Sequence, residues 1–466
     1  MPARFTDITD DSRRVTPGAL FVAMRGAAFD GHDYLAAAAR AGATAAIVED
    51  ASRTSLPAYV VRDARRAAGA AARAAFLEPA NDLTMVGVTG TNGKTTTVGL
   101  LRHLLDEPGA EAASIGTLGV LRGSRGEVVP GGGGLTTPGV VELQRVLRQL
   151  RDAGVQRVAM EVSSHSLDQG RVEGVQFQAA VFTNVTRDHL DYHLTMEAYV
   201  AAKARLVDYV AEDGTLVLNA DDRIWDALAP RHRRVRFSLT AAADVTATDV
   251  RWTSRGSEWT LAAGADRATV TLPLLGAFNV ANALGAAAAA WALGHSVGRV
   301  AERLCTAPQV PGRLERLLDE PAVLRDYAHT PDALDRALDA VRPFVRGKLI
   351  VVFGCGGDRD RGKRPQMGTI AESRADYAIL TSDNPRTEDP ERILDDIEQG
   401  MQGRNHERIE DRRSAIARAL TMASAEDMIL LAGKGHETYQ IRGTTAHPFD
   451  EQVIVRELAT GQGIRP

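Results

Sequence analysis

The sequence is poor in the features that mark exported proteins. Only two cysteines, Cys305 and Cys355, occur in 466 residues, so the chain has neither a disulfide framework nor a Cys-x-x-Cys pair. The N-terminal segment MPARFTDITDDSRRV lacks the apolar stretch of a secretory signal. We therefore expect a cytoplasmic protein with reduced thiols.

The chain also lacks a long apolar run and an excess of basic residues. Its most apolar helical candidate, residues 284–294, is much shorter than the ~20 residues that span a bilayer. The formal net charge of −5 argues against a protein that binds nucleic acid or a membrane surface through a general basic field. We expect no nucleic-acid partner, no membrane insertion and a monomer, with any anionic ligand met by local groups.

What the sequence does contain is a recurring pattern of apolar runs that end in polar or glycine-rich loops. Six segments have this form: 83–93, 157–165, 179–189, 348–357, 377–384 and 428–437. Segments with helical spacing lie between several of them, one of which starts at Thr330-Pro331-Asp332. Apolar strands alternating with helices predict an α/β fold with parallel sheets covered on both faces, which bind ligands at the carboxyl ends of their strands.

The length of the chain calls for more than one core, and we expect three domains. The segments EPANDLTMV and APQVPGRLER suggest breaks near residues 82 and 309. The predicted domains are a small α/β N-terminal domain (1–82), a central P-loop-type ATP-binding domain with a parallel sheet (83–309) and a C-terminal Rossmann-like domain (310–466). Alternating residues at 244–274 predict an antiparallel excursion.

The segment VTGTNGKTTT, residues 88–97, follows a predicted strand and opens a predicted helix. Backbone N–H groups in such a loop, with a helix N-terminus behind them, cradle an anion. Lys94 can reach the outer phosphates of a nucleotide, and the Thr95 hydroxyl can ligate Mg²⁺. The spacing departs from the common G-x-x-x-x-G-K-T pattern, because Val88 stands where the first glycine is expected. The predicted nucleotide-binding residues are Gly90, Thr91, Asn92, Gly93, Lys94, Thr95 and Thr96.

Three further residues are candidates for the chemistry. Glu161 ends a predicted strand and can supply a second oxygen ligand, opposite Thr95, to a hard cation. His189 follows a strand, although a hydrogen-bonded loop histidine is equally consistent with its chemistry. Lys203 lies on a predicted amphipathic helix, where a surface lysine is the ordinary explanation.

The segment SDNPR, residues 382–386, follows the apolar run Tyr377–Leu380. Asp389 and Pro390 then fit the N-cap and first position of a helix. Taken alone, the segment is typical of a turn. Its place at the carboxyl end of a predicted strand also fits a loop that binds a ligand carrying charges of both signs.

Together these motifs resemble the Mur ligase family, in its MurE-type branch that adds the third amino acid to the peptidoglycan precursor. GTNGKT is the form of phosphate loop that this family shares with folylpolyglutamate synthetases. The resemblance covers nearly the whole chain, and it is carried further by residues 10–34, by LTTP at 135–138, by EVSSHSLDQGR at 161–171, by RDHLDYH and YVAAKARL, and by LAGKGHETYQ. Ser166 departs from it, because family members often have glycine there.

The resemblance implies a contact set for each substrate. For the UDP-linked acceptor these are Ser12, Ala27, Ala28, Phe29, Thr136, Thr137, Ser163, Gln169 and Arg171. For ATP, Asn279, Asn282, Arg313 and Asp326 join the phosphate loop. For the amino acid they are Arg359, Asp383, Asn384, Pro385, Arg386, Gly433 and Glu437. The implied Mg²⁺ ligands are Thr95, Glu161, His189 and Lys203 as a carbamate, and the implied catalytic residues are Lys94, His189 and Lys203.

The implied reaction is the ATP-dependent ligation of meso-diaminopimelate to the D-glutamate of UDP-N-acetylmuramoyl-L-alanyl-D-glutamate through an acyl phosphate. Arg386 would pair with the carboxylate that distinguishes diaminopimelate from lysine. The alternatives are a lysine-adding MurE-type ligase, a MurF-type ligase, a folylpolyglutamate synthetase and a P-loop switch or motor. The absence of an Asn-Lys-x-Asp motif argues against a GTPase switch, and Lys94, Thr95 and Glu161 together argue against a non-catalytic scaffold.

Overall fold

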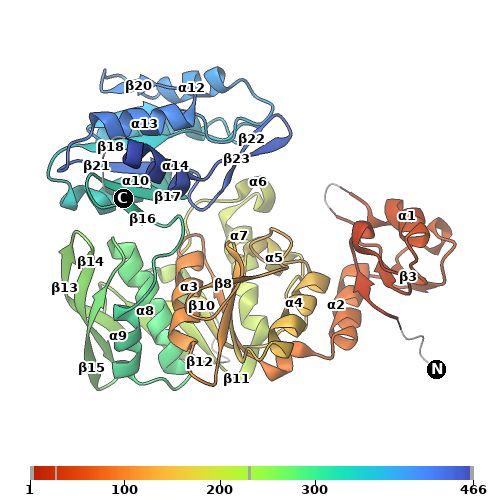
Figure 1. The fold of residues 1–466 in the computed structure, drawn as a ribbon. Helices are drawn as coiled ribbons and strands as arrows, with labels where there is room; N and C mark the ends of the chain where they lie inside the picture. Colours follow the sequence, from red (N-terminus) through yellow and green to blue (C-terminus); the bar gives the residue numbers. More distant parts are fainter. Residues whose placement is uncertain (1–4, 27–28, 229–231, 462–466) are drawn as a thin grey trace. The chain divides into compact units, whose positions relative to one another are not determined.

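The computed structural model describes residues 5–26, 29–228 and 232–461 (Figure 1). Its internal contacts divide the chain into two compact units. The first unit comprises residues 1–249, 259–270 and 281–308, and the second comprises residues 250–258, 271–280 and 309–466. None of the helices in the described part of the chain is long and apolar enough to cross a membrane.

The first unit begins with a small sheet in which every pair of neighbouring strands is parallel. Its strands, in spatial order, are β1 (Ile8–Thr9), β2 (Leu20–Val22), β3 (Ala45–Val48) and β4 (Ala58–Val60). Helix α1 (Leu35–Arg40) precedes β3, and α2 (Ala64–Ala75) follows β4. Apolar residues of this sheet and of α2 form one buried cluster with Val140 and Val141, the first residues of α4 (Val140–Asp152).

A sheet of eleven strands follows, in the order β15-β14-β13-β12-β11-β10-β5-β9-β6-β7-β8. Its middle is parallel and consists of β12 (Arg233–Ser238), β11 (Val210–Asn219), β10 (Phe177–Phe182), β5 (Thr84–Thr89), β9 (Arg157–Glu161) and β6 (Ala112–Gly116). Strands β7 (Gly119–Arg122) and β8 (Glu127–Val129) continue it antiparallel. The stretch at 244–274 forms β13 (Val245–Thr253), β14 (Gly256–Ala263) and β15 (Asp266–Leu272).

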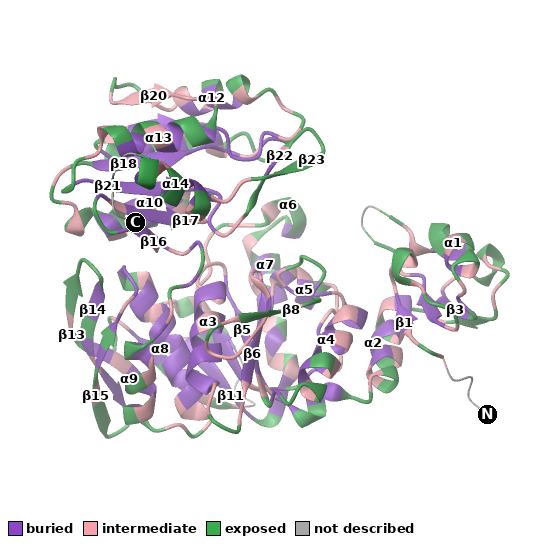
Figure 2. Ribbon diagram, viewed as in Figure 1, coloured by how far each residue is buried: buried purple, intermediate pink, exposed green. Residues whose placement is uncertain are grey.

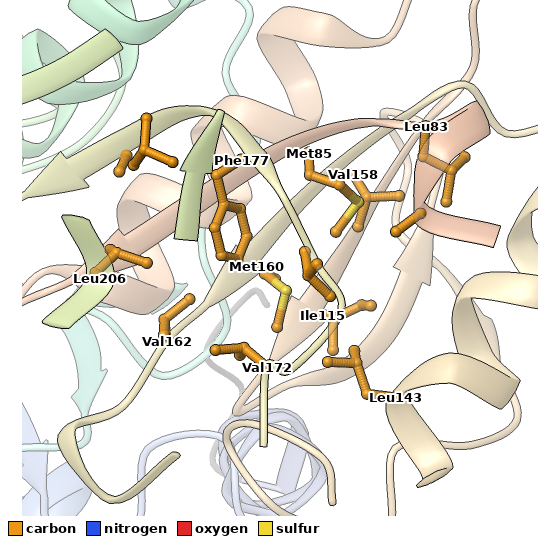
Figure 3. Close-up of a cluster of buried hydrophobic side chains, with 14 of the residues drawn as sticks. Leu83, Met85, Ile115, Leu143, Val158, Met160, Val162, Val172, Phe177 and Leu206 are labelled. Atoms are coloured by element: carbon orange, nitrogen blue, oxygen red, sulfur yellow. The ribbon is translucent and has the colours of Figure 1, made fainter. Parts of the chain in front are cut away.

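Alternating side chains of the parallel strands point to opposite faces of this sheet, as strand geometry requires. Met85 of β5, Met160 of β9 and Ile115 of β6 join a buried cluster with Leu143 of α4 (Figure 3). Val86, the neighbour of Met85, is also fully buried but does not belong to that cluster. The remaining helices of this region are α3 (Lys94–Leu105), α5 (Ser164–Asp168), α6 (Leu190–His193), α7 (Met196–Ala204), α8 (Ala277–Ala292) and α9 (Val297–Cys305).

The second unit contains a six-stranded sheet that is parallel except at one edge. Its order is β16 (Glu315–Leu318), β17 (Ala322–Asp326), β21 (Met428–Ala432), β18 (Leu349–Phe353), β19 (Tyr377–Leu380) and β20 (His406–Arg408), with only β16 antiparallel to its neighbour. A separate antiparallel hairpin is formed by β22 (Tyr439–Arg442) and β23 (Thr445–Pro448). The predicted strand at 377–380 is thereby confirmed.

Helices cover both faces of this sheet, so its central strands β21 and β18 are buried at every residue, whereas the edge strand β20 is half-buried (Figure 2). Val351 of β18 packs in a cluster with α10 (Pro331–Val341), α11 (Lys363–Arg374) and α12 (Pro390–Glu398). Its neighbour Val352 packs instead with α13 (Arg412–Met422) and α14 (Glu451–Gly461). Both predicted helix starts are confirmed, because the side chains of Thr330 and Asp389 cap α10 and α12.

Candidate active site

The phosphate loop connects β5 to α3 and depends on two glycines with positive φ. Gly90 has φ of 144° and Gly93 has φ of 88°, values that L side chains rarely adopt. A Cβ at Gly90 would collide with the Thr183 hydroxyl, and one at Gly93 would collide with the Asn282 amide. The loop can therefore approach its neighbours only because these positions carry no side chain.

The residues that follow β10 hold this loop in place. The backbone N–H of Thr91 donates to the Asn184 carbonyl at 2.6 Å, and that of Asn92 donates to Asn184 Oδ1 at 3.0 Å. Thr183 Oγ1 donates to the Asn92 carbonyl at 2.7 Å. Our sequence predictions did not include Thr183 or Asn184. The adjacency of β10 and β5 explains their role, since the carboxyl ends of parallel neighbours share one edge.

Two lysines converge on a single carbonyl of the phosphate loop. Lys94 Nζ donates to the carbonyls of Gly90 at 2.9 Å and Thr91 at 2.8 Å, and Lys203 Nζ donates to the Gly90 carbonyl at 2.8 Å. Lys203 is only 1% exposed, and its ammonium nitrogen lies 4.4 Å from the centre of the Tyr199 ring. Burial, reinforced by the charge of Lys94, holds the pKa of Lys203 well below its usual value. A surface lysine, the ordinary explanation, is therefore wrong.

Glu161 meets Thr95 as the metal hypothesis requires. Thr95 Oγ1 donates to Glu161 Oε2 at 3.2 Å. The other carboxylate oxygen, Oε1, accepts from the backbone N–H of Thr117 at 2.8 Å. A hydroxyl beside a buried carboxylate is the oxygen donor pair that a hard cation prefers. Over the described residues, however, no group of three or more His, Cys, Asp and Glu side chains is placed to hold a metal ion.

His189 lies in an aromatic cluster next to these lysines. It has φ of 53° and immediately precedes α6. Its ring centre is 4.8 Å from that of His165 and 6.1 Å from that of Tyr199. Burial is the largest effect on the pKa of His189 and lowers it, and the charges of Lys94 and Lys203 act in the same direction. A neutral imidazole, which these effects favour, is the form that can ligate a metal.

The residues predicted to bind the sugar and peptide of the acceptor form a connected network. Thr137 Oγ1 donates to the Glu161 carbonyl at 2.9 Å and accepts from the Ser163 backbone N–H at 3.1 Å. Arg171 donates to Gln169 Oε1 through Nε at 3.0 Å and Nη2 at 2.6 Å, and to the Thr137 carbonyl through Nη1 at 3.1 Å. The arginine is therefore fixed in direction before any substrate binds.

The other predicted acceptor contacts lie outside this hydrogen-bonded network. Thr136 Oγ1 lies 3.2 Å from Thr117 Oγ1. Ser12 begins a short 3-10 helix, Ser12–Arg14, in which it is half-buried. The side chain of Phe29 is 72% exposed. Ala27 and Ala28 lie outside the described residues.

The predicted ATP contacts outside the phosphate loop lie in both units. Asn282 is against Gly93, in the first unit. Asn279 belongs to the second unit, where its Nδ2 donates to the Leu275 carbonyl at 2.8 Å. Also in the second unit, the Asp326 carboxylate accepts from the Leu314 N–H at 2.7 Å, and the Arg313 guanidinium lies 4.8 Å from the centre of the Tyr327 ring.

The loop after β19 brings together the residues predicted to bind the amino acid. Arg386 has φ of 52° and donates through Nη1 to the Gly357 carbonyl at 2.9 Å. Asn384 donates through Nδ2 to Glu437 Oε2 at 2.8 Å, and a Cβ at Gly433 would meet the Asp383 carboxylate. Pro385 is buried, and Arg359 is exposed, donating to the Asp358 carbonyl at 3.1 Å.

Two opposite charges in this loop have no ion-pair partner among the residues that the structure describes. Arg386 forms no salt bridge with any residue in the described ranges, although it is half-buried. The Asp383 side chain is only slightly exposed and likewise has no hydrogen-bond or ion-pair partner there. The loop thus presents one cation and one anion, as its sequence suggested.

The chain thus combines the phosphate loop with a charged loop, residues 381–389, which connects β19 to α12. Comparison with known proteins explains this combination. Three family models match successive segments: "Mur ligase family, catalytic domain" over residues 4–82, "Mur ligase middle domain" over 88–290 and "Mur ligase, glutamate ligase domain" over 312–435. Together they cover most of the chain. The chain belongs to the Mur ligase family.

Relatives within the Mur ligases agree over nearly full length. The proteins named UDP-N-acetylmuramoyl-L-alanyl-D-glutamate–2,6-diaminopimelate ligase from Synechococcus elongatus and Xylella fastidiosa (strain Temecula1) are 46% and 47% identical, over 97% and 96% of this chain and 93% of each relative. A solved structure with the same name is 36% identical, with a TM-score of 0.70 over 100% of this chain and 98% of its own.

The fold extends to other members of the family. The MurF ligase from Thermotoga maritima, solved in complex with ADP, is 20% identical, with a TM-score of 0.69 over 98% of this chain and 97% of its own. As a Mur ligase, the chain is an ATP-dependent enzyme that forms an amide bond, and its three-domain α/β fold is confirmed. The hairpin β22–β23 lies beyond the last matched residue, 435, yet it contacts the charged loop.

Proposed function

We propose that the protein joins meso-diaminopimelate to the D-glutamate of UDP-N-acetylmuramoyl-L-alanyl-D-glutamate during synthesis of the peptidoglycan precursor. The single observation that carries the choice of amino acid is the Arg386 guanidinium, which is half-buried and has no carboxylate partner in the described ranges. Diaminopimelate carries an ammonium and a carboxylate at its far end, whereas lysine carries only the ammonium. An unpaired arginine in this position favours the first ligand and penalises the second.

The reaction has two steps in this proposal. The D-glutamate γ-carboxylate attacks the terminal phosphorus of ATP, and ADP leaves from the acyl phosphate that forms. The amine of diaminopimelate then attacks the acyl carbon, loses a proton, and expels phosphate from a tetrahedral intermediate. Charge collects on phosphoryl oxygens, so the protein contributes cations and positioning rather than a nucleophile.

Lys94 is the residue we assign to those oxygens. Its ammonium already lies beside the loop, on the carbonyls of Gly90 and Thr91, and has to exchange them for phosphate oxygens when ATP binds. The N–H groups of Thr91 and Asn92 are held by Asn184, so the loop keeps its shape during that exchange. Thr96, Asn279, Asn282, Arg313 and Asp326 complete the proposed ATP contacts.

Mg²⁺ fits Thr95 and Glu161, which offer oxygen atoms to a hard cation, and we assign His189 and Lys203 to the metal as well. A bound metal would neutralise phosphoryl charge. Lys203 suits a carbamate, because only a neutral amine adds to CO₂, and its burial favours that form. The product is a carboxylate on a long stem, formed with release of one proton.

The acceptor is assigned to Ser12, Ala27, Ala28, Phe29, Thr136, Thr137, Ser163, Gln169 and Arg171. Arg171 suits a carboxylate or phosphate, since Gln169 and Thr137 fix its direction. We keep the domain boundaries near residues 82 and 309, the monomeric state and a cytoplasmic location as proposals. The use of ATP and a UDP-linked substrate supports that location.

A ligation assay with purified protein, ATP, Mg²⁺ and the UDP-linked dipeptide tests the proposal. The third substrate is meso-diaminopimelate, L-lysine, D-lysine or none, and both phosphate release and UDP-linked product are measured. We expect product and phosphate only with meso-diaminopimelate. Product with L-lysine instead identifies a lysine-adding enzyme, and equal phosphate release under every condition identifies a switch that hydrolyses ATP.

A further inference from the structure

Lys434 is a fully buried cation at the edge of the charged loop, and none of the assignments above uses it. Its side chain is 0% exposed, although a lysine is among the residues least often buried. It follows Gly433 directly after β21, so it lies at the carboxyl end of a strand two places from β19 in the sheet. A buried ammonium is costly unless it is paired.

The partners of Lys434 are two residues assigned to the amino acid. Its Nζ lies 3.1 Å from Glu437 Oε2 and 3.3 Å from Asn384 Oδ1. Asn384 Nδ2 donates to the same Glu437 oxygen at 2.8 Å. The three side chains therefore form a closed triangle in which Lys434 supplies the only positive charge. The rings of Tyr439 and Phe449 lie 5.8 Å and 6.0 Å from the ammonium.

This triangle fixes which way the Asn384 amide points. Its Oδ1 accepts from Lys434 and also from the Ile441 N–H at 2.8 Å, so both neighbours on that side are donors. The hairpin strand β22 holds the rest of the loop in the same manner. Gln440 Nε2 donates to the Asp383 carbonyl at 2.9 Å, and the Arg386 N–H donates to the Ile441 carbonyl at 3.1 Å.

The charges of Asp383, Arg386, Lys434 and Glu437 then balance. Glu437 is neutralised by Lys434, while Asp383 and Arg386 have no ion-pair partners in the described residues. These four side chains sum to zero charge, which matches the zwitterionic end of an amino acid. Without Lys434 the sum becomes −1, which matches an ammonium without a carboxylate, as at the far end of lysine. Arg359 is exposed, so solvent screens its charge.

We propose that Lys434 is a positioning and specificity residue, which holds Asn384 and Glu437 and keeps the amino-acid site neutral so that it selects a zwitterionic ligand end over a simple ammonium. The inference rests on the proposed function and adds to it a residue that does not touch the substrate. Selectivity then depends on the sum of the site's charges as well as on the direct contact of Arg386 with a carboxylate.

Four proteins test this inference: the wild type, Lys434→Met, Glu437→Gln and the double variant. For each, kcat/KM is measured with meso-diaminopimelate and with L-lysine, and the ratio of the two is the selectivity. We expect Lys434→Met to lower the selectivity by about tenfold or more, because it leaves the half-buried Glu437 carboxylate without its ion-pair partner. The KM values for ATP and the UDP-linked dipeptide should stay within about twofold of the wild type.

The double variant is the matched control, because it removes both charges and returns the site to neutrality. Its selectivity should recover to within about threefold of the wild type, and Glu437→Gln alone should be at least as selective as the wild type. If Lys434→Met does not fold, the double variant and Glu437→Gln decide the matter, since the double variant should be less selective than Glu437→Gln, and equal selectivity of these two variants also overturns the inference.

An unchanged selectivity in Lys434→Met, or a double variant no more selective than Lys434→Met, overturns the inference. So does an equal loss for all three substrates, which identifies a purely structural lysine. Failure of the wild type to use meso-diaminopimelate refutes the proposed function instead, and that result is read before any variant is compared.

Discussion

Two loops in this chain leave a parallel strand at its carboxyl end and enter a helix, one in each unit. The first joins β5 to α3, and the second joins β19 to α12. At the first loop, Lys94 and also Lys203, which comes from α7, donate to the backbone carbonyl of Gly90. In the second, Asp383 and Arg386 have no ion-pair partners in the described residues, while the hairpin β22–β23 bonds to the backbone.

The difference follows from what each loop recognises. Phosphate is bound largely by backbone N–H groups, so the loop needs a fixed main chain and can let its side chains rest on carbonyls. An amino acid with two charged ends is recognised by side chains, which must stay available for the ligand. The backbone of such a loop then has to be held from outside, and here the hairpin β22–β23 does so, while Lys434 holds the side chain of Asn384.

Among the substitutions that test this difference between the two loops, removal of Lys94 should have the largest effect on activity. We expect Lys94→Ala to lower kcat for ligation by about 10³-fold, because no other group in the loop carries a positive charge to the phosphates. Phosphate release and product formation should fall together with every amino acid. Lys348→Ala, at an exposed lysine, is the control and should behave as the wild type. Near-normal phosphate release by Lys94→Ala would contradict the assignment.

Lys203, which reaches the phosphate loop from α7, tests whether a lysine at this position acts as a carboxylate. We expect Lys203→Ala to lose about 10²–10³-fold in kcat, since the long-stemmed anion is gone. Added formate or acetate should restore part of the activity, which Lys94→Ala should not show. Full activity of the unrescued Lys203→Ala protein would sink the carbamate hypothesis.

In the second loop the expected effect is smaller and confined to one substrate. We expect Arg386→Ala to lower kcat/KM for meso-diaminopimelate on the order of 10²-fold, through loss of a bidentate pair. The KM values for ATP and the UDP-linked dipeptide should not change. Arg392→Ala, at an exposed arginine of α12, is the matched control. Equal losses for all three substrates would make Arg386 structural.

The smallest expected effect concerns stability. It depends on a histidine in α3, the helix that follows the phosphate loop, and has no counterpart in α12, the helix that follows the charged loop. Buried His103 of α3 lies 2.8 Å from the Arg303 carbonyl through Nε2, and burial lowers its pKa from 6.5 to about 4. Between these values the unfolded chain binds a proton that the folded chain does not. The free energy of unfolding should therefore fall by about 2–3 kcal/mol as the pH drops from 6.5 to 4.

His103→Gln should lack this pH-dependent term, whereas α12 contains no histidine at all. Denaturant unfolding followed by tryptophan fluorescence measures the effect, because three of the four tryptophans belong to the first unit: Trp225, Trp259 and Trp291. Parallel pH profiles for the wild type and His103→Gln would show that His103 does not supply the term.

Much of the fold could be predicted because it depends on local patterns. Strand β19 coincides with the apolar run at 377–380, and α12 starts where Asp389 and Pro390 predicted. The meeting of Thr95 and Glu161 was also predictable, since Thr95 comes soon after β5 and Glu161 ends the neighbouring parallel strand β9. These features need only the alternation of apolar residues and the chemistry of caps and loops.

Other features could not be predicted from the sequence, because they depend on contacts between distant segments. Lys203 has the spacing of a surface residue, and only the packing of α7 against the phosphate loop buries it. Asn184 and Thr117 support the loop and Glu161 without any motif of their own. Lys434 lies inside the motif LAGKGHETYQ, but nothing in that motif reveals its bonds to Asn384 and Glu437.

The amino-acid sequence by itself determined the α/β class, the phosphate loop, the charged loop and the resemblance to a ligase family. Each of these is encoded within about a dozen neighbouring residues, where steric limits and hydrogen bonding act locally. The tertiary structure decided which charges are neutralised and which remain for a ligand. That outcome depends on burial and on partners far along the chain, and both arise only when the sheets and helices pack.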